Sequence, residues 1–90
     1  MVTPVAAEDL ARLIVTHSLP PDTIARVKRS LRPLADFPFL GASLEGRWRG
    51  FRFVLGPWRW MVIVYVFDED GDRVSVVTVQ DGRSHRAPLR

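Results

Sequence analysis

The stretch from Leu44 to Phe67 constrains the fold most strongly, because it reads as two β-strands joined at Gly56-Pro57. Aromatic and β-branched residues dominate both halves, as is typical of strands that lie half-buried in a sheet. No acidic residue stands between Gly46 and Phe67. The arginines of this stretch are Arg47, Arg49, Arg52 and Arg59. The sequence therefore predicts a β-hairpin that carries a strong positive charge.

The register of this hairpin decides which side chains share a face. If Gly56-Pro57 is a two-residue loop, Arg52 lies opposite Met61 and Val54 lies opposite Arg59. Arg52 and Arg59 then become diagonal neighbours about 7–8 Å apart, close enough for two guanidinium groups to bind one phosphate. The opposite face collects Phe51, Phe53, Leu55, Trp58, Trp60, Val62 and Val64. We expect this apolar face, its two tryptophans included, to pack on the helices and the Arg52/Arg59 face to be open.

The composition is that of a small basic domain. The chain has 90 residues, a net charge of +3, and 13 Lys and Arg residues, of which only Lys28 is a lysine. A domain of this size and charge favours nucleic acid or an acidic protein as its partner. The alternative is an arginine-rich surface that is only solvated.

Several kinds of site are disfavoured by what the sequence lacks. It has no cysteine, and its two histidines, His17 and His85, stand far apart, so we expect no metal site and no cofactor. The acidic residues from Asp68 to Asp72 are typical of a turn rather than of a calcium loop. The sequence shows no signal peptide and no apolar run of membrane-spanning length, which predicts a cytoplasmic protein.

Two helices are expected before the hairpin. The first runs from Val5 to about Ser18 with Thr3 as its cap, and His17 is expected to be a packed end-of-helix residue rather than a ligand. Asp22 can cap the second helix, which Pro33 should kink or break.

A last strand is expected from Arg73 to Gln80, followed by a flexible basic tail over residues 82–90. Helices grouped ahead of an antiparallel meander indicate an α+β fold. We therefore expect a single domain over residues 1–90, in which two N-terminal helices pack on a twisted antiparallel sheet of three strands, or of four.

An ordered set of residues extends over nearly the whole chain. It consists of Leu34, Pro38, Gly41, Leu44 and Gly46, then Phe51-Arg52, then Gly56, Trp58, Arg59 and Val62, and finally a valine-rich last strand. In this order the set resembles the RelE/ParE toxin superfamily, the small basic toxins of bacterial toxin–antitoxin pairs. The resemblance implies a RelE-like fold and an acidic antitoxin that wraps the toxin.

In the RelE branch, the resemblance implies an endoribonuclease, or mRNA interferase, that cleaves mRNA at the ribosome without a metal. The ribose 2′-oxygen attacks the adjacent phosphate, and basic side chains stabilise the charge that develops there. Arg59 matches the family's phosphate-binding arginine and Arg52 matches a basic position on the preceding strand. His85 is the candidate for proton transfer. Candidate RNA-binding residues are Arg47, Trp48, Arg49, Arg83 and Arg86.

The sequence also departs from the family's pattern. Only Met1–Thr3 precede the first helix, so the family's first strand is nearly absent. Either the chain is truncated, or the edge is open to a homodimer contact or to an antitoxin strand. Val54 stands where ribosome-dependent members often carry a second basic residue. The alternative functions are therefore a ParE-like inhibitor of DNA gyrase, or an inactive member that only binds its antitoxin. A third alternative function is a generic basic RNA-binding module.

Overall fold

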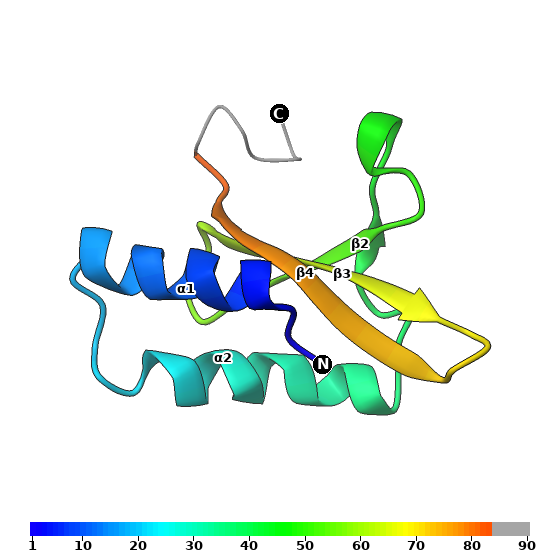
Figure 1. Cartoon of the computed structure of the whole chain (residues 1–90), viewed down its shortest axis with the longest axis horizontal. Coiled ribbons are helices and arrows are strands. Elements are labelled where there is room, and N and C mark those ends of the chain that lie inside the picture. Colours follow the sequence, from blue (N-terminus) through cyan, green and yellow to red (C-terminus); the bar gives the residue numbers. More distant parts are fainter. Residues whose placement is uncertain (84–90) are drawn as a thin grey trace.

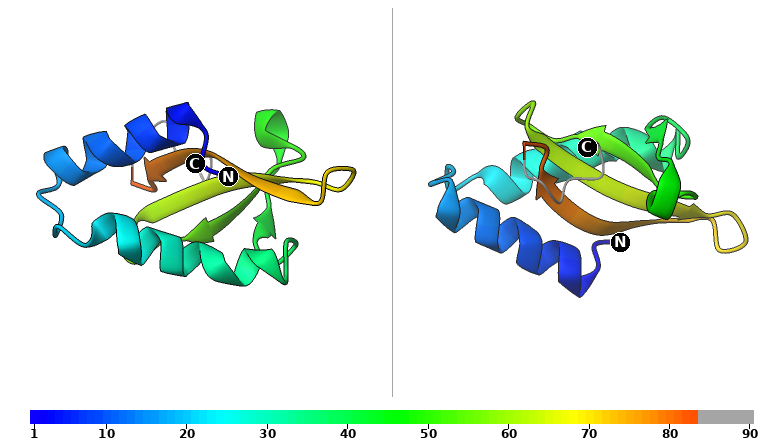
Figure 2. Two further views of the ribbon diagram at one scale, coloured as in Figure 1. Left: turned by 60° about the horizontal axis from the view of Figure 1, so that its bottom comes forward. Right: turned by 90° about the horizontal axis from the view of Figure 1, so that it is seen from above.

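The computed structural model describes residues 1–83 and places two helices against one face of an antiparallel sheet (Figure 1). Helix α1 spans Pro4–Thr16 and helix α2 spans Thr23–Leu31, followed by the 3-10 helix η1 at Arg32–Ala35. The remaining elements are β1 (Ala42–Ser43), the 3-10 helix η2 (Gly46–Trp48), β2 (Arg52–Leu55), β3 (Met61–Asp68) and β4 (Arg73–Asp81). The strands lie in the order β1-β2-β3-β4 and twist across one another (Figure 2). The expected α+β fold is confirmed, with four strands.

The helix signals of the sequence act locally. Thr3 is the N-cap of α1, and its Oγ1 accepts a hydrogen bond from the N–H of Ala6 (3.2 Å). α2 gives way to η1 next to Pro33, so the expected break is confirmed. Asp22 stands at the N-cap of α2 but makes no capping bond, and its carboxylate instead accepts from the Nε of Arg26 (2.9 Å). Among residues 1–83, no helix has the length and apolar content needed to cross a membrane.

The predicted register of the β2–β3 hairpin is wrong. Arg52 pairs with Tyr65 rather than with Met61. The N–H of Gly56 donates to the carbonyl of Met61 (2.9 Å), so residues 57–60 form the loop. Pro57 excludes a two-residue type I′ turn, because its φ is fixed at about −65° and that turn requires the left-handed conformation at both positions.

The two faces of the sheet are exchanged relative to the prediction. Met61, Ile63 and Tyr65 are fully buried against side chains of α1 and α2, and Arg52 shares their face. We call the opposite face the far face, and it carries Leu44, Trp48, Phe51, Phe53, Val62, Val64 and Val77. The pattern misled the prediction because β3 is apolar on both faces, so alternation does not say which face meets the helices.

The edge of β4 that the sequence predicts to be open is partly closed by the chain itself. Val2 forms a parallel bridge with Val76, and the N–H of Thr3 donates to the carbonyl of Val76 (3.0 Å). Further along this edge, the N–H of Val79 points to the carboxylate of Asp9 (3.4 Å). The fourth strand is β1, at the other edge of the sheet. A homodimer or an antitoxin strand at the β4 edge stays a prediction.

Candidate nucleic-acid interface

The far face carries an aromatic cluster that η2 holds over the sheet. The rings of Trp48 and Phe51 pack edge to face with 5.7 Å between their centroids, and both side chains are half-buried. They cover the buried side chains of Val62 and Val64. The chain enters η2 at Gly46 with φ +66°, a left-handed conformation that favours glycine. Partly exposed rings on a sheet face are suited to stacking with the bases of single-stranded RNA.

Exposed arginine side chains lie beside this cluster and in the β2–β3 loop. Arg47 and Arg49 flank Trp48 in the sequence, and Arg59 lies between the two tryptophans of the loop. All three arginines are exposed, and within residues 1–83 none of their side chains makes a hydrogen bond, ion pair or ring contact. Their charges are therefore free to meet phosphate groups.

Arg52 is already engaged, so the predicted Arg52/Arg59 pair is wrong. Its Nη1 donates to the carbonyls of Gly41 (2.8 Å) and Phe39 (3.3 Å), and its guanidinium lies 5.0 Å from the centroid of the Phe39 ring. Arg52 opens β2, whereas Arg59 lies beyond the strand's last residue. At about 3.4 Å per residue, the length of β2 alone separates them by about 10 Å. Arg52 therefore holds the connector at residues 36–41, and it is not the diagonal neighbour of Arg59 that the sequence predicts.

Trp58 and Trp60 pack against the core on the helix side of the sheet, as the sequence predicts. Their rings stack with 6.1 Å between centroids. The guanidinium of Arg26 lies over Trp58 at 5.9 Å, and the imidazole of His17 stacks on Trp60 at 4.6 Å. Ring stacking and a cation–π contact therefore join α1, the β2–β3 loop and α2.

A carboxylate at the end of β4 extends this group of contacting side chains. Oδ2 of Asp81 lies 3.0 Å from Nε2 of His17, and the Arg83 side chain donates to both oxygens of Asp81 (2.9 and 2.8 Å). The Arg83 guanidinium also lies 5.3 Å from the Trp60 ring. These bonds, from Arg83 first and His17 second, hold the pKa of Asp81 well below its usual value. Arg83, a candidate RNA-binding residue, is thus paired with a carboxylate.

Two candidate residues and one contact complete the comparison with the sequence. His85 and Arg86 lie outside the described residues, so their roles stay predictions. The contact between His17 and Asp81 was missed, because the two residues are 64 positions apart and no local pattern links them. Their only signal is that one stands at a helix end and the other at a strand end.

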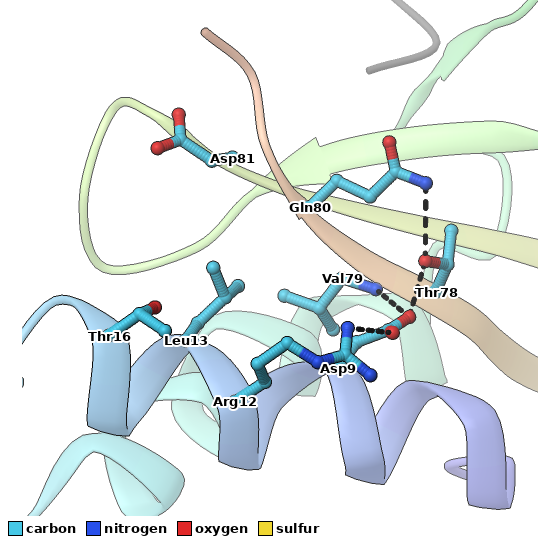
Figure 3. Close-up of a pocket in the computed structure, with 8 residues that line it drawn as sticks. All are labelled: Asp9, Arg12, Leu13, Thr16, Thr78, Val79, Gln80 and Asp81. Carbon is cyan, nitrogen blue, oxygen red and sulfur yellow. Dashed lines mark hydrogen bonds and ion pairs between the residues drawn. The ribbon is translucent and has the colours of Figure 1, made fainter. Parts of the chain in front are cut away.

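A groove of about 320 Å³ runs between α1 and β4 (Figure 3). Two carboxylates line it, those of Asp9 and Asp81. Asp9 accepts from Oγ1 of Thr78 (2.6 Å), from the N–H of Val79 (3.4 Å) and from Nη1 of Arg12 (3.3 Å). Within residues 1–83, the buried Oε1 of Gln80 has no hydrogen-bond partner. Asp9 is bonded to these donors and Asp81 to His17 and Arg83, so the groove presents two structural carboxylates and not an unengaged base.

Comparisons with known proteins identify a solved structure with a similar fold. No protein-family model matches the sequence, and no curated protein matches it. The structure is similar to a chain in the crystal structure of the toxin–antitoxin complex RelBE2 from Mycobacterium tuberculosis, with a TM-score of 0.68 and 23% sequence identity. The match covers 90% of this chain and 93% of that chain. The RelE-like α+β fold that the sequence predicts is therefore confirmed.

Proposed function

We propose that the chain is the toxin of a type II toxin–antitoxin pair and that it cleaves mRNA at the ribosome in the cytoplasm. The observation that carries this proposal is the fold shared, over 90% of the chain, with a member of a toxin–antitoxin complex. The exposed, unpaired arginines Arg47, Arg49 and Arg59 support RNA as the target, because RNA binding depends on positive charge that is not already neutralised.

The proposed chemistry needs a cation at the phosphate and a proton-transfer group. Attack of the ribose 2′-oxygen on the adjacent phosphate places negative charge on the phosphate oxygens. Arg59 would stabilise that charge, while Arg47 and Arg49 hold the RNA backbone and Trp48 stacks on a base. His85 would move the proton. Arg52 would act by holding the connector, through its bonds to the carbonyls at residues 39 and 41.

An acidic antitoxin is the proposed protein partner. The net charge of +3 favours an acidic partner. The connector also exposes large apolar side chains, with Phe37 at 64%, Phe39 at 52% and Leu40 at 60% exposure. Adjacent apolar side chains at this exposure are typical of protein–protein contacts.

One observation favours a second candidate, a member that acts by binding alone. Arg52 is held by backbone carbonyls on the helix side and is not paired with Arg59 as the sequence predicts, so the two-arginine phosphate site is not formed in this arrangement. A ParE-like inhibitor of DNA gyrase, or a partner that only binds its antitoxin, needs no such pair.

Induced expression in a bacterial host separates these functions. The measurements are growth, the 5′ ends of cellular mRNA, and a reporter of DNA damage. We expect growth arrest with new mRNA ends, lost in Arg59→Ala and in His85→Ala but kept in Arg12→Ala, which removes an exposed arginine of α1. Growth arrest with intact mRNA and an active damage reporter would favour gyrase. Normal growth with stable, folded protein would reject both toxic activities and favour a partner that only binds its antitoxin.

A further inference from the structure

A shallow pocket of about 330 Å³ lies between α2 and the β2–β3 loop. It is lined by Asp22, Arg26, Arg29, Ser30 and Pro57. The α2 residues stand three and four positions apart, so they project from one side of the helix. The pocket therefore combines two guanidinium groups with one carboxylate and has a net positive charge.

Arg26 is fixed in place with most of its donors unused. Its Nε donates to Oδ2 of Asp22 (2.9 Å), and its guanidinium lies over the ring of Trp58 at 5.9 Å. A guanidinium has five N–H donors, and within residues 1–83 the bond to Asp22 is the one that Arg26 makes through its side chain. A planar fork that is held on two sides and still has free donors is suited to an oxyanion.

Arg29 supplies the second charge. Its side chain is exposed and makes no hydrogen bond or ion pair within residues 1–83. The pKa of Asp22 is lowered chiefly by its hydrogen bond from Arg26, and the positive charge of Arg29 lowers it further. Both arginines therefore lie close enough to the Asp22 carboxylate to lower its pKa.

We propose that this pocket is a phosphate-binding subsite. The source of the phosphate, single-stranded RNA, rests on the proposed function. Pro57 belongs to the loop that carries Arg59, so an RNA strand that reaches Arg59 can continue around this loop to α2. The subsite gives Arg26 and Arg29 a role in holding the RNA backbone, separate from the far face.

The first test uses inorganic phosphate, so it does not depend on RNA. The full chain is titrated at constant ionic strength while NMR follows the side-chain Nε–H signals of Arg26 and Arg29. We expect saturable shifts of both signals, and an affinity at least about fivefold weaker in Arg29→Ala. Arg32→Ala is the matched control, because Arg32 is exposed on the next turn and does not line the pocket. Signals that do not saturate, or equal affinity in Arg29→Ala, would overturn the subsite.

The second test identifies the source of the phosphate. The affinity for a ten-nucleotide oligouridine is measured over a range of salt concentrations. Losing one phosphate contact should reduce the slope of log K against log salt by about 0.7, so we expect this reduction in Arg29→Ala and not in Arg32→Ala. If wild-type chain binds phosphate but not oligouridine, the subsite stands and the proposed RNA target fails. If oligoglutamate saturates the two arginine signals at a lower concentration than phosphate, the pocket belongs to an acidic protein partner and the proposal is wrong.

Discussion

The side chains of His17 and Asp81 meet where α1 and β4 both end, with 3.0 Å between Nε2 and Oδ2. The His17 ring stacks on Trp60, and the N–H of Gly82 donates to the Trp60 carbonyl (2.6 Å). The last described residues are therefore tied to both the first helix and the β2–β3 loop.

Replacing Asp81 should lower stability and flatten its dependence on pH. The pKa of Asp81 in the folded chain lies below its usual 3.8, so its contribution to stability is complete above about pH 4 and is lost as the pH falls further. We expect Asp81→Asn to reduce the free energy of unfolding by about 1–3 kcal/mol at pH 7, and by less at about pH 2. Urea unfolding at several pH values measures both effects. Asp70→Asn, in the exposed β3–β4 turn, is the control and should change neither.

Arg52 and Arg59 should differ in what their removal affects. Arg52→Ala removes bonds from a charged donor to two carbonyls, so we expect a loss of about 1–2 kcal/mol in unfolding free energy. Arg59→Ala should change stability by less than about 0.5 kcal/mol, because the Arg59 side chain is exposed and makes no hydrogen bond or ion pair within residues 1–83. Arg59→Ala should instead weaken RNA binding, measured by fluorescence anisotropy. If Arg52→Ala and Arg59→Ala weaken RNA binding equally and neither lowers stability, the two arginines bind one phosphate together.

The parts of the fold that follow from local signals could be predicted. Thr3 caps its helix by a bond to a residue three positions away, and Pro33 breaks the second helix through its own ring. The valine-rich last strand begins at Arg73 as expected and ends one residue later than expected, at Asp81. Each of these signals acts within one turn or one strand, so the sequence contains it in full.

The parts that failed depend on competition between distant segments. β3 is buried at every position from Met61 to Tyr65, so either of its faces could have met the helices. The sequence does not show that η2 would cover one face and leave the other to α1 and α2. The Arg52/Arg59 site failed for the same reason, because it required both the short loop and the open face. The pairing of His17 with Asp81 likewise depends on the tertiary fold alone.

Removing the Tyr65 hydroxyl should loosen the connector without disturbing the core. Tyr65 is fully buried, and its hydroxyl donates to the Pro38 carbonyl (2.7 Å) and accepts from the N–H of Gly41 (2.9 Å). Tyr65→Phe keeps the ring and leaves both backbone groups unsatisfied, so we expect a loss of about 1–3 kcal/mol in unfolding free energy. Hydrogen exchange of the Gly41 amide should become faster, while the β3 amides keep their protection relative to the new global stability. An unchanged Gly41 exchange rate would contradict the assignment of this hydroxyl as the anchor of the connector.

Asp9 should hold the β4 edge against α1 through its carboxylate. It accepts from the Thr78 hydroxyl (2.6 Å) and from the Val79 N–H (3.4 Å), beyond the part of the edge that the first three residues cover. Asp9→Ala leaves these donors without their acceptor, so we expect a loss of about 1–2 kcal/mol in unfolding free energy and faster hydrogen exchange at Val79. Glu8→Ala is the matched control, because it removes the same charge from an exposed side chain that makes no hydrogen bond or ion pair within residues 1–83. Equal effects of the two substitutions would show that the charge of α1, and not the contact at the strand edge, carries the stabilisation. If Asp9→Ala instead promotes dimerisation in light scattering, the carboxylate also protects this edge from pairing with a second copy.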